Sequence, residues 1–398
     1  MRILALSHVP AYGSGSGIYA AQVAGMLARH GHETALLTPA HSPYDVPEGV
    51  RLNWIGTPGH VGRWTFATPF PSFSGHREST LTYDDLTPGE IASYLAVART
   101  AVNDVAAEFR PDVIHVNHAF LLAMVVAEAA RWPSVVVSHG SEFMRPMNGH
   151  LQALRQRALD GAGVLAAVSA ASRDELADHT GRAPSAIALV PPGYDPEIFR
   201  PTSVDRSAVL SRLGMDPLRP CAAYLGRLVQ YKRVGDLLRA VAAIPVHLRP
   251  DVLIMGDGPE RGKLEELAAA LGLGRIRFHA ATRDPGRVAE VMNAVDAVVI
   301  PSEDDPFPMA GIEAMACGTP VITSDRCGTA ELAASGPGAS YRTGDVDALA
   351  DLLREACAED WKHARGMLGP AAVREFTWRH ATDMLTALYE RAAGGVGN

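Results

Sequence analysis

Short apolar runs alternate with Ala/Leu-rich stretches of helical periodicity along almost the whole chain. Within residues 234–241 the apolar side chains repeat with the i, i+3, i+4, i+7 spacing of one helix face, and the same spacing recurs at 264–271 before Gly272. Strands and helices that alternate in this way form βαβ units, so we predict an α/β protein with parallel sheets. The predicted buried strands are Ile3–Leu6, Thr34–Leu37, Val113–Val116, Val135–Val137 and Val164–Val168 in the first half, and Cys221–Leu225, Val252–Met255, Ala297–Ile300 and Val321–Thr323 in the second.

The length of 398 residues predicts two or three domains. The segment Val190–Asp205 has four prolines, one glycine and no helical period, as is common where domains meet. We therefore expect a first domain over residues 1–195 and a second over 196–375. The last helix, 376–393, carries an apolar stripe from Trp378 to Tyr389 and is expected to pack back onto the first domain.

Charge and composition exclude several classes of protein. The net charge of −8 argues against nonspecific binding to nucleic acid or to anionic membranes. The four cysteines show no CxxC spacing, which fits neither a disulfide framework nor a zinc site and suits a reducing cytoplasm. Neither a signal peptide nor a transmembrane run is predicted. Only three of the 36 basic residues are lysines, namely Lys232, Lys263 and Lys362.

The region Gly56–Gly89 is rich in Pro, Gly and Ser and contains several aromatic residues. A loop of this length is often functional, so Trp64 and its neighbours up to Phe73 could cover an acceptor. Alternatively, the aromatic side chains only pin a solvated insertion to the body of the domain.

Glycines and histidines follow predicted strands of the first half. Gly13, Gly15 and Gly17 precede a helix, where backbone N–H groups can bind a phosphate, although a plain flexible loop explains them equally well. A dinucleotide site would need an acid after the second strand, which instead ends Leu37-Thr38-Pro39. Ligands bind beyond the carboxyl ends of parallel strands. Of the histidines found there, we favour a structural role for His115 and His118 and a functional role for His139.

The second half contains cations and carboxylates at similar places. Arg227 and Lys232 share one strand-to-helix loop, where two cations suit a diphosphate. Asp305 precedes a helix expected to start near Met309, and Glu313 is expected in its first turn. These carboxylates could accept hydrogen bonds from sugar hydroxyls, or Glu313 could simply cap the helix. The Asp345-Val346-Asp347 triplet is interpreted as a helix cap and not as a metal site.

Three segments, GRLVQYKR (226–233), MGDGPERGKLEELA (255–268) and DPFPMAGIEAMACGTPVITSD (305–325), resemble the retaining GT-B glycosyltransferases of family four. The resemblance also covers GSGSGIY (13–19), HGSE (139–142), the Pro-rich linker and the last helix. It implies two Rossmann-like domains with a nucleotide sugar in the cleft between them, and a C-terminal helix that crosses back to the first domain.

The resemblance also implies roles for individual residues. His139, Asp305, Arg227 and Lys232 would be catalytic, with the two cations on the donor diphosphate and Glu313 on the ribose. Gly15, Gly17, Phe307, Met309 and Ala310 would complete the donor site, and His115, His118 and Trp64 would lie on the acceptor side. Asp305 stands where the family has Glu, and Pro308 stands where it usually has Gly, which removes one backbone N–H.

The implied reaction is transfer of a sugar, with retention, from a nucleoside-diphosphate sugar to a hydroxyl of a small polar or natural-product acceptor. UDP is favoured over GDP, and neither a metal nor another cofactor is expected. Four alternatives stay open: a GT-B epimerase or phosphorylase, a transferase acting on a lipid-linked or cell-envelope acceptor, a non-catalytic nucleotide-sugar binding protein, and an NAD enzyme.

Overall fold

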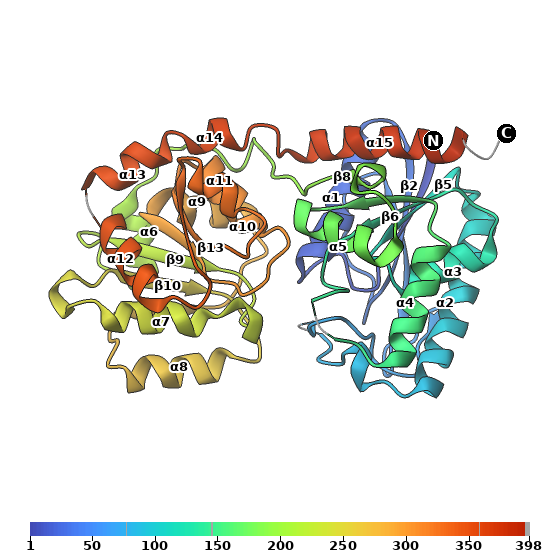
Figure 1. Cartoon of the computed structure of the whole chain (residues 1–398), viewed down its shortest axis with the longest axis horizontal. Coiled ribbons are helices and arrows are strands. Elements are labelled where there is room, and N and C mark those ends of the chain that lie inside the picture. Colours follow the sequence, from blue (N-terminus) through green and yellow to red (C-terminus); the bar gives the residue numbers. More distant parts are fainter. Residues whose placement is uncertain (77, 145, 358, 395–398) are drawn as a thin grey trace. The chain divides into compact units, whose positions relative to one another are not determined.

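The computed structural model describes residues 1–76, 78–144, 146–357 and 359–394. It divides into two units (Figure 1): Met1–Pro192 with Trp378–Asn398 form unit 1, and Gly193–Thr377 form unit 2. The division falls inside the Pro-rich segment, close to the boundary expected from the sequence.

Unit 1 contains a parallel sheet with the strand order β4-β3-β2-β1-β5-β6-β7-β8. The strands are β1 (Arg2–Leu6), β2 (Glu33–Pro39), β3 (Val50–Gly56), β4 (Trp64–Thr65), β5 (Val113–Asn117), β6 (Ser134–Ser138), β7 (Val164–Ala167) and β8 (Ala188–Leu189). The helices are α1 (Gly15–Arg29), α2 (Pro88–Phe109), α3 (Leu121–Ala129), α4 (Gly149–Asp160), α5 (Ala170–Thr180) and α15 (Trp378–Gly394), with 3-10 turns η1 (Tyr83–Asp85) and η2 (Pro184–Ala186). Every predicted strand of this half is present. Strands β3, β4 and β8 were not predicted; they lie toward the sheet edges and have mixed polarity or only two residues.

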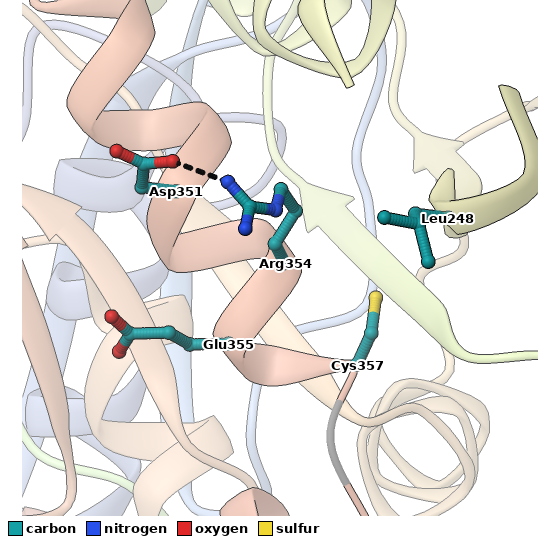
Figure 2. A pocket seen from close by; sticks show the side chains of 5 residues that line it. All are labelled: Leu248, Asp351, Arg354, Glu355 and Cys357. Carbon is teal, nitrogen blue, oxygen red and sulfur yellow. Dashed lines mark hydrogen bonds and ion pairs between the residues drawn. The ribbon is translucent and has the colours of Figure 1, made fainter. Parts of the chain in front are cut away.

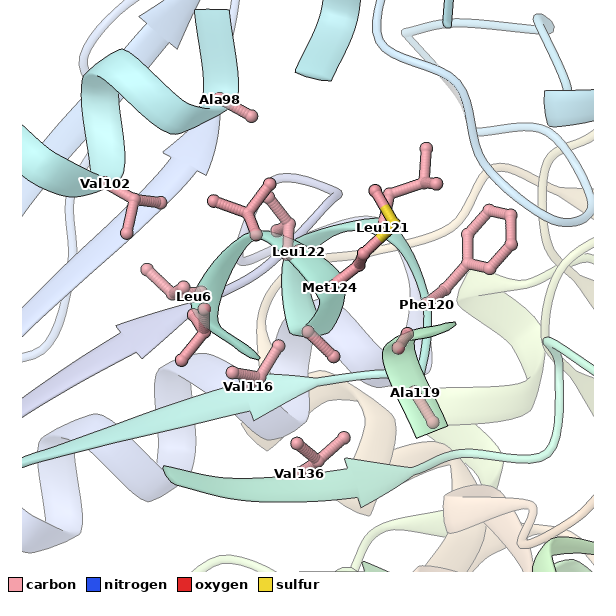
Figure 3. Close-up of a cluster of buried hydrophobic side chains, with 14 of the residues drawn as sticks. Leu6, Ala98, Val102, Val116, Ala119, Phe120, Leu121, Leu122, Met124 and Val136 are labelled. Carbon is pink, nitrogen blue, oxygen red and sulfur yellow. The ribbon is translucent and has the colours of Figure 1, made fainter. Parts of the chain in front are cut away.

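The core of unit 1 forms where α3 lies on the central strands. Leu6, Val116 and Val136 come from the adjacent strands β1, β5 and β6 and pack under α3 (Figure 3). Ala98 and Val102 of α2 belong to the same buried cluster. Because α3 is covered by the sheet and by its neighbouring helices, it is apolar nearly all round.

Helix α15 follows unit 2 in the sequence but packs in unit 1, against α1 and β6. Its apolar stripe is buried, and the Tyr389 hydroxyl lies 2.7 Å from Nδ1 of His115 on β5. The predicted return of the last helix to the first domain is therefore confirmed. On helix α1, Ile18 is 37% exposed, because Tyr19 and Ala20 occupy the buried face.

The aromatic side chains of the region 56–89 are core residues. Phe66 stacks on Tyr94 of α2 with ring centroids 4.4 Å apart, and Phe70 is fully buried. Trp64 is 8% exposed, and its Nε1–H donates to Asp104 of α2 over 3.0 Å. The structure favours the second interpretation of this region: its aromatic side chains pin it to the body of unit 1.

Unit 2 contains a parallel sheet with the order β11-β10-β9-β12-β13-β14. Its strands are β9 (Cys221–Leu225), β10 (Asp251–Met255), β11 (Ile276–His279), β12 (Ala297–Ile300), β13 (Val321–Ser324) and β14 (Gly338–Tyr341). Its helices are α6 (Arg206–Arg212), α7 (Val234–Ala243), α8 (Arg261–Ala270), α9 (Pro285–Ala294), α10 (Met309–Ala316), α11 (Ala330–Ala334), α12 (Val346–Ala356), α13 (Glu359–Gly366) and α14 (Gly369–Ala372), with 3-10 turns η3 (Gln230–Lys232) and η4 (Val246–Leu248). Successive residues of β9 alternate between two hydrophobic clusters, so both faces of the sheet are covered, as a parallel sheet requires. The two edge strands, β11 and β14, were not predicted.

Three smaller expectations concern caps, thiols and membrane spans. Asp345 is the N-cap of α12, and its carboxylate accepts the Ala348 N–H over 2.9 Å, which confirms the capping interpretation. All four cysteines are free thiols. Among the described helices, none combines the length and the apolar character needed to cross a bilayer.

Candidate active site

Both sheets reverse their strand order at one point, and several of the predicted site residues follow the strands that meet there. In unit 2, β9 lies between β10 and β12. Because β9 and β12 are parallel neighbours, the loops that follow them begin side by side. In unit 1, β1 lies in the same way between β2 and β5. Open α/β sheets bind their ligands at the carboxyl ends of strands at such switch points.

In unit 2 this arrangement brings Lys232 and Asp305 together. The Lys232 ammonium forms an ion pair with Oδ2 of Asp305, and the two side chains are 16% and 11% exposed. Burial by itself lowers the pKa of Lys232, but the Asp305 charge and the neighbouring Tyr231 and Tyr224 raise it overall, so the lysine stays charged. Sequence reasoning placed both residues in the donor site but did not foresee that they pair.

The loop that carries Arg227 is supported by the GDG segment after β10. Leu228 N–H donates to the Asp257 carbonyl over 2.9 Å, and the Tyr224 hydroxyl donates to the Arg227 carbonyl over 2.6 Å. A Cβ atom at Gly256 would lie 2.0 Å from the Gly226 oxygen, so this close backbone approach requires glycine. The glycine-rich segment therefore shapes the loop on which Arg227 stands.

Gly256→Ala is expected to destabilise unit 2 by about 2 kcal/mol, because the backbone segments at Gly226 and Gly256 must separate. The same shift should weaken the binding of any ligand that Arg227 contacts. Thermal unfolding measures the first effect. Gly262→Ala on α8 is the matched control, because no atom of the described residues lies within 4 Å of its added Cβ. The control should be neutral or stabilising by up to about 1 kcal/mol. Equal stability of the two variants would contradict this role of Gly256.

The N-terminus of α10 is open. Pro308 is the N-cap and provides no side-chain hydrogen bond, while its carbonyl accepts the Gly311 N–H over 2.9 Å. Within the described residues, the N–H groups of Met309 and Ala310 have no acceptor. Such a terminus favours an anion because of its free donors and the helix dipole. The loss of the N–H at Pro308 therefore leaves two neighbouring donors in place.

Glu313 is the fifth residue of α10 and not part of its first turn, so the capping interpretation is wrong. Burial raises the pKa of its carboxyl to about 7, with no compensating partner among the described residues. Phe307, in contrast, packs on the core of unit 2 and stacks on Phe376 with centroids 5.6 Å apart. Core packing explains the position of the Phe307 ring. No described residue of unit 2, in contrast, provides a hydrogen-bond or ion-pair partner for the Glu313 carboxylate.

In unit 1, three imidazoles meet beyond the carboxyl ends of β1, β5 and β6. The ring of His118 lies 4.2 Å from that of His8 and 4.6 Å from that of His139, between centroids. Burial lowers the pKa of all three, that of His139 to about 3, so the cluster is uncharged. His118 is 2% exposed and adopts φ = 75°, a conformation that is costly for a residue other than glycine. His8 was not predicted as a site residue, although it lies two residues after the strand Ile3–Leu6, beyond a strand end where ligands bind.

His115 has a structural position in the core of unit 1. It is 1% exposed, and both ring nitrogens are engaged, Nε2 by Asn117 at 3.0 Å and Nδ1 by Tyr389 at 2.7 Å. Trp64 packs in the same unit: its ring and its N–H contact α2, and β4 is an edge strand, three strands away from β1.

Gly15 and Gly17 lie inside the first turn of α1, not in a loop before it. The Gly17 N–H donates to the Ser14 hydroxyl over 3.1 Å, so the N-cap already uses this donor. A Cβ atom at Gly17 would lie 2.1 Å from the Pro10 oxygen, which explains the glycine by packing. Gly15 has open space around it. The phosphate role expected of Gly17 is therefore not supported by the position of its amide.

A hollow of about 570 Å³ lies elsewhere in unit 2, between Leu248 of η4 and the end of α12 (Figure 2). Asp351 and Arg354 on its wall pair with each other at 2.8 Å. It lies toward the amino-terminal edge of the sheet, opposite the carboxyl edge that carries Asp305, and it is not part of the candidate site. Among the described residues, no group of three or more His, Cys, Asp or Glu side chains could hold a metal ion.

Comparison with known proteins agrees with this geometry. Residues 211–372 match the family described as glycosyl transferases group 1, and residues 13–198 match glycosyltransferase family 4. The chain is 30% identical to the D-inositol 3-phosphate glycosyltransferase of Mycolicibacterium gilvum over 403 residues, which cover 95% of this chain and 85% of that relative. The chain belongs to the group 1 glycosyltransferases. The enzyme of the same name from Rhodococcus opacus is 29% identical and aligns over 95% of this chain and 86% of its own length.

Solved structures show the same fold for this glycosyltransferase. Sucrose-phosphate synthase from Thermosynechococcus elongatus superimposes with a TM-score of 0.80 at 21% identity, covering 99% of both chains. HepE from Anabaena, solved in complex with UDP and glucose, superimposes with a TM-score of 0.74 at 19% identity, covering 98% of this chain and all of HepE. The GT-B fold and the enzyme class that the resemblance implied are confirmed.

Proposed function

We propose that this glycosyltransferase moves a sugar, with retention of anomeric configuration, from a UDP-sugar to a hydroxyl of a small polar acceptor. The observation that carries the proposal is the composition of the site in unit 2. An uncapped helix N-terminus, a charged lysine and a carboxylate without a partner among the described residues occur on the loops after β9 and β12 and on helix α10.

Each part of that site suits one part of a nucleoside-diphosphate sugar. An ammonium group has three donors, so Lys232 can keep its bond to Asp305 and still donate to phosphate oxygens. Arg227 and the N–H groups of Met309 and Ala310 add further donors for the diphosphate. The Glu313 carboxylate would accept hydrogen bonds from the ribose hydroxyls. Asp305 has a second oxygen for a hydroxyl of the donor sugar.

The comparisons support the finer parts of the proposal. HepE shares the fold and was solved with UDP-glucose as well as with UDP, which favours uridine as the base. The relatives named D-inositol 3-phosphate glycosyltransferase act, by that name, on a small polyhydroxyl phosphate. A small polar acceptor therefore fits better than a lipid-linked one.

The proposed chemistry needs little covalent participation by the protein. The bond between the anomeric carbon and the diphosphate oxygen breaks, and its electron pair leaves with the diphosphate. The acceptor oxygen bonds to the same carbon from the same face, and its proton passes to an oxygen of the leaving diphosphate. Lys232, Arg227 and the α10 dipole stabilise the developing charge. His139 is neutral and would accept a hydrogen bond from a sugar hydroxyl near the reacting carbon.

The test begins with calorimetric binding of UDP, GDP and NAD, followed by a screen of UDP-sugars with inositol phosphates and other polyols. We expect UDP to bind most tightly and the product to keep the anomeric configuration of the donor by NMR. Tight NAD binding without affinity for UDP would overturn the proposal. A changed nucleotide sugar without acceptor would indicate an epimerase, and a requirement for inorganic phosphate would indicate a phosphorylase.

Transfer is expected to continue after removal of divalent metals, because protein cations and helix amides neutralise the diphosphate. Initial rates should differ by less than about twofold between protein dialysed against EDTA and protein supplied with Mg²⁺. A loss of about a hundredfold, restored by Mg²⁺, would show that a metal neutralises the leaving group instead.

A further inference from the structure

A chain of hydrogen bonds runs from helix α15 to His139. The Tyr389 hydroxyl lies 2.7 Å from Nδ1 of His115, and Nε2 of His115 lies 3.0 Å from Oδ1 of Asn117. The same Oδ1 lies 3.1 Å from Nε2 of His139. Asn117 therefore joins two imidazoles through one oxygen atom, and both bonds are made at the carboxyl end of β5.

The positions of the protons follow from this arrangement. An amide oxygen only accepts hydrogen bonds, so both Nε2 atoms must carry a proton. Nδ1 of His115 then accepts the Tyr389 O–H. Burial lowers the pKa of His115 to about 4 and that of His139 to about 3, so neither ring carries a second proton near neutral pH. Nδ1 of His139 is left with its lone pair, and no hydrogen bond from the described residues reaches it.

Two further features hold this geometry in place. Asn117 is 1% exposed, so packing restricts the side chain that makes both bonds. The Tyr19 ring of α1 meets the His139 ring edge-on, with centroids 4.8 Å apart. The His139 ring is therefore held by a hydrogen bond on one nitrogen and by packing on its side.

We propose that Asn117, itself held by His115 and Tyr389, is a positioning residue that fixes His139 as its Nε2-protonated tautomer and directs its Nδ1 lone pair toward a sugar hydroxyl. The proposal rests on the proposed function for the role of His139, but the tautomer can be measured without any substrate. Because Tyr389 lies on α15, this series of hydrogen bonds also makes the geometry of His139 depend on how α15 packs in unit 1.

Protonation of His139 would turn Nδ1 into a donor and remove the acceptor that the sugar hydroxyl needs. The other titratable groups around His139 are neutral imidazoles and phenols, apart from one buried carboxyl whose pKa is raised by desolvation. These groups are His8 after β1, Tyr19 on α1, His115 and His118 at the end of β5, Glu142 after β6 and Tyr389 on α15. The cluster therefore supplies little charge to stabilise an imidazolium.

The test replaces Asn117 by aspartate, which keeps the accepting oxygen and adds a charge. In ¹⁵N-labelled protein without substrate, His139 of the wild type should appear as the Nε2–H tautomer and should not titrate above about pH 5. Asn117→Asp should raise its titration midpoint by at least about one pH unit and create an acid limb in kcat/KM. Asn148→Asp is the matched control, because Asn148 caps α4 by accepting the Leu151 N–H, which aspartate does equally well.

Tyr389→Phe removes the hydroxyl at the α15 end of the hydrogen-bond series and nearly keeps the side-chain volume in the core. It should lower kcat about tenfold with little change in KM and allow His115 to change tautomer. If Asn117→Asp does not fold, Tyr389→Phe still tests whether the hydrogen-bond series positions His139. An Nδ1-protonated His139 in the wild type, or a His139 titration that both substitutions leave unchanged, would overturn the proposal. A wild type with the expected tautomer but no sugar transfer would count against the proposed function instead.

Discussion

Lys232→Met is expected to lower the free energy of unfolding by about 3 kcal/mol and to reduce UDP-sugar affinity about 10- to 100-fold. The first effect arises because Asp305, only 11% exposed, loses the cation that compensates its charge. The second arises because the diphosphate loses a charged donor. Chemical denaturation and calorimetry measure the two effects separately.

The double variant Lys232→Met/Asp305→Leu separates the two roles of the lysine. With both charges removed, stability should return to within about 1 kcal/mol of the wild type, while donor binding stays weak. Lys263→Met is the control, since Lys263 is 75% exposed in its pair with Glu260 and its loss should change stability by less than about 0.5 kcal/mol. Unchanged donor affinity in Lys232→Met would remove the lysine from the donor site.

Glu313→Gln is expected to stabilise the free protein above neutral pH and at the same time to weaken donor binding. The folded protein holds the Glu313 pKa at about 7, above its value of about 4.3 in the unfolded chain. Its contribution to stability is therefore complete below about pH 4 and is lost as pH rises through about 7. Because the side chain keeps some contact with solvent, we expect about 2 kcal/mol from this difference at pH 8. Urea unfolding of both proteins across this pH range measures it.

The same carboxyl predicts that donor binding releases a proton. Ribose hydroxyls donate to the ionised carboxylate, so donor affinity of the wild type should rise about tenfold between about pH 6 and pH 8. Calorimetry in buffers of different ionisation enthalpy detects the released proton. Glu313→Gln should remove this pH dependence, whereas Glu265→Gln, at a 47% exposed position on α8, should retain it. A pH-independent affinity in the wild type would show that Glu313 does not contact the donor.

The order of strands and helices could be predicted from the sequence, because apolar periodicity is a local signal. The predicted strands in both halves are present, and the strands that were missed lie at or toward the sheet edges, where burial is incomplete and alternation is weak. The loops that bear Lys232, Asp305 and His139 could also be predicted, because ligand sites of α/β sheets follow the strand ends.

Only the tertiary structure decided which partner each polar group has. Lys232 and Asp305 are 73 residues apart, and His115 and Tyr389 are 274 residues apart, so no local pattern indicates either pair. The same holds for the Gly17 amide, which the Ser14 cap occupies, and for Trp64, which is buried against α2. The sequence by itself determined the two parallel sheets and the places where their loops emerge. Folding decided the hydrogen bonds, burial and charge states at those places, because these depend on distances of a few ångströms between segments that are remote in the chain.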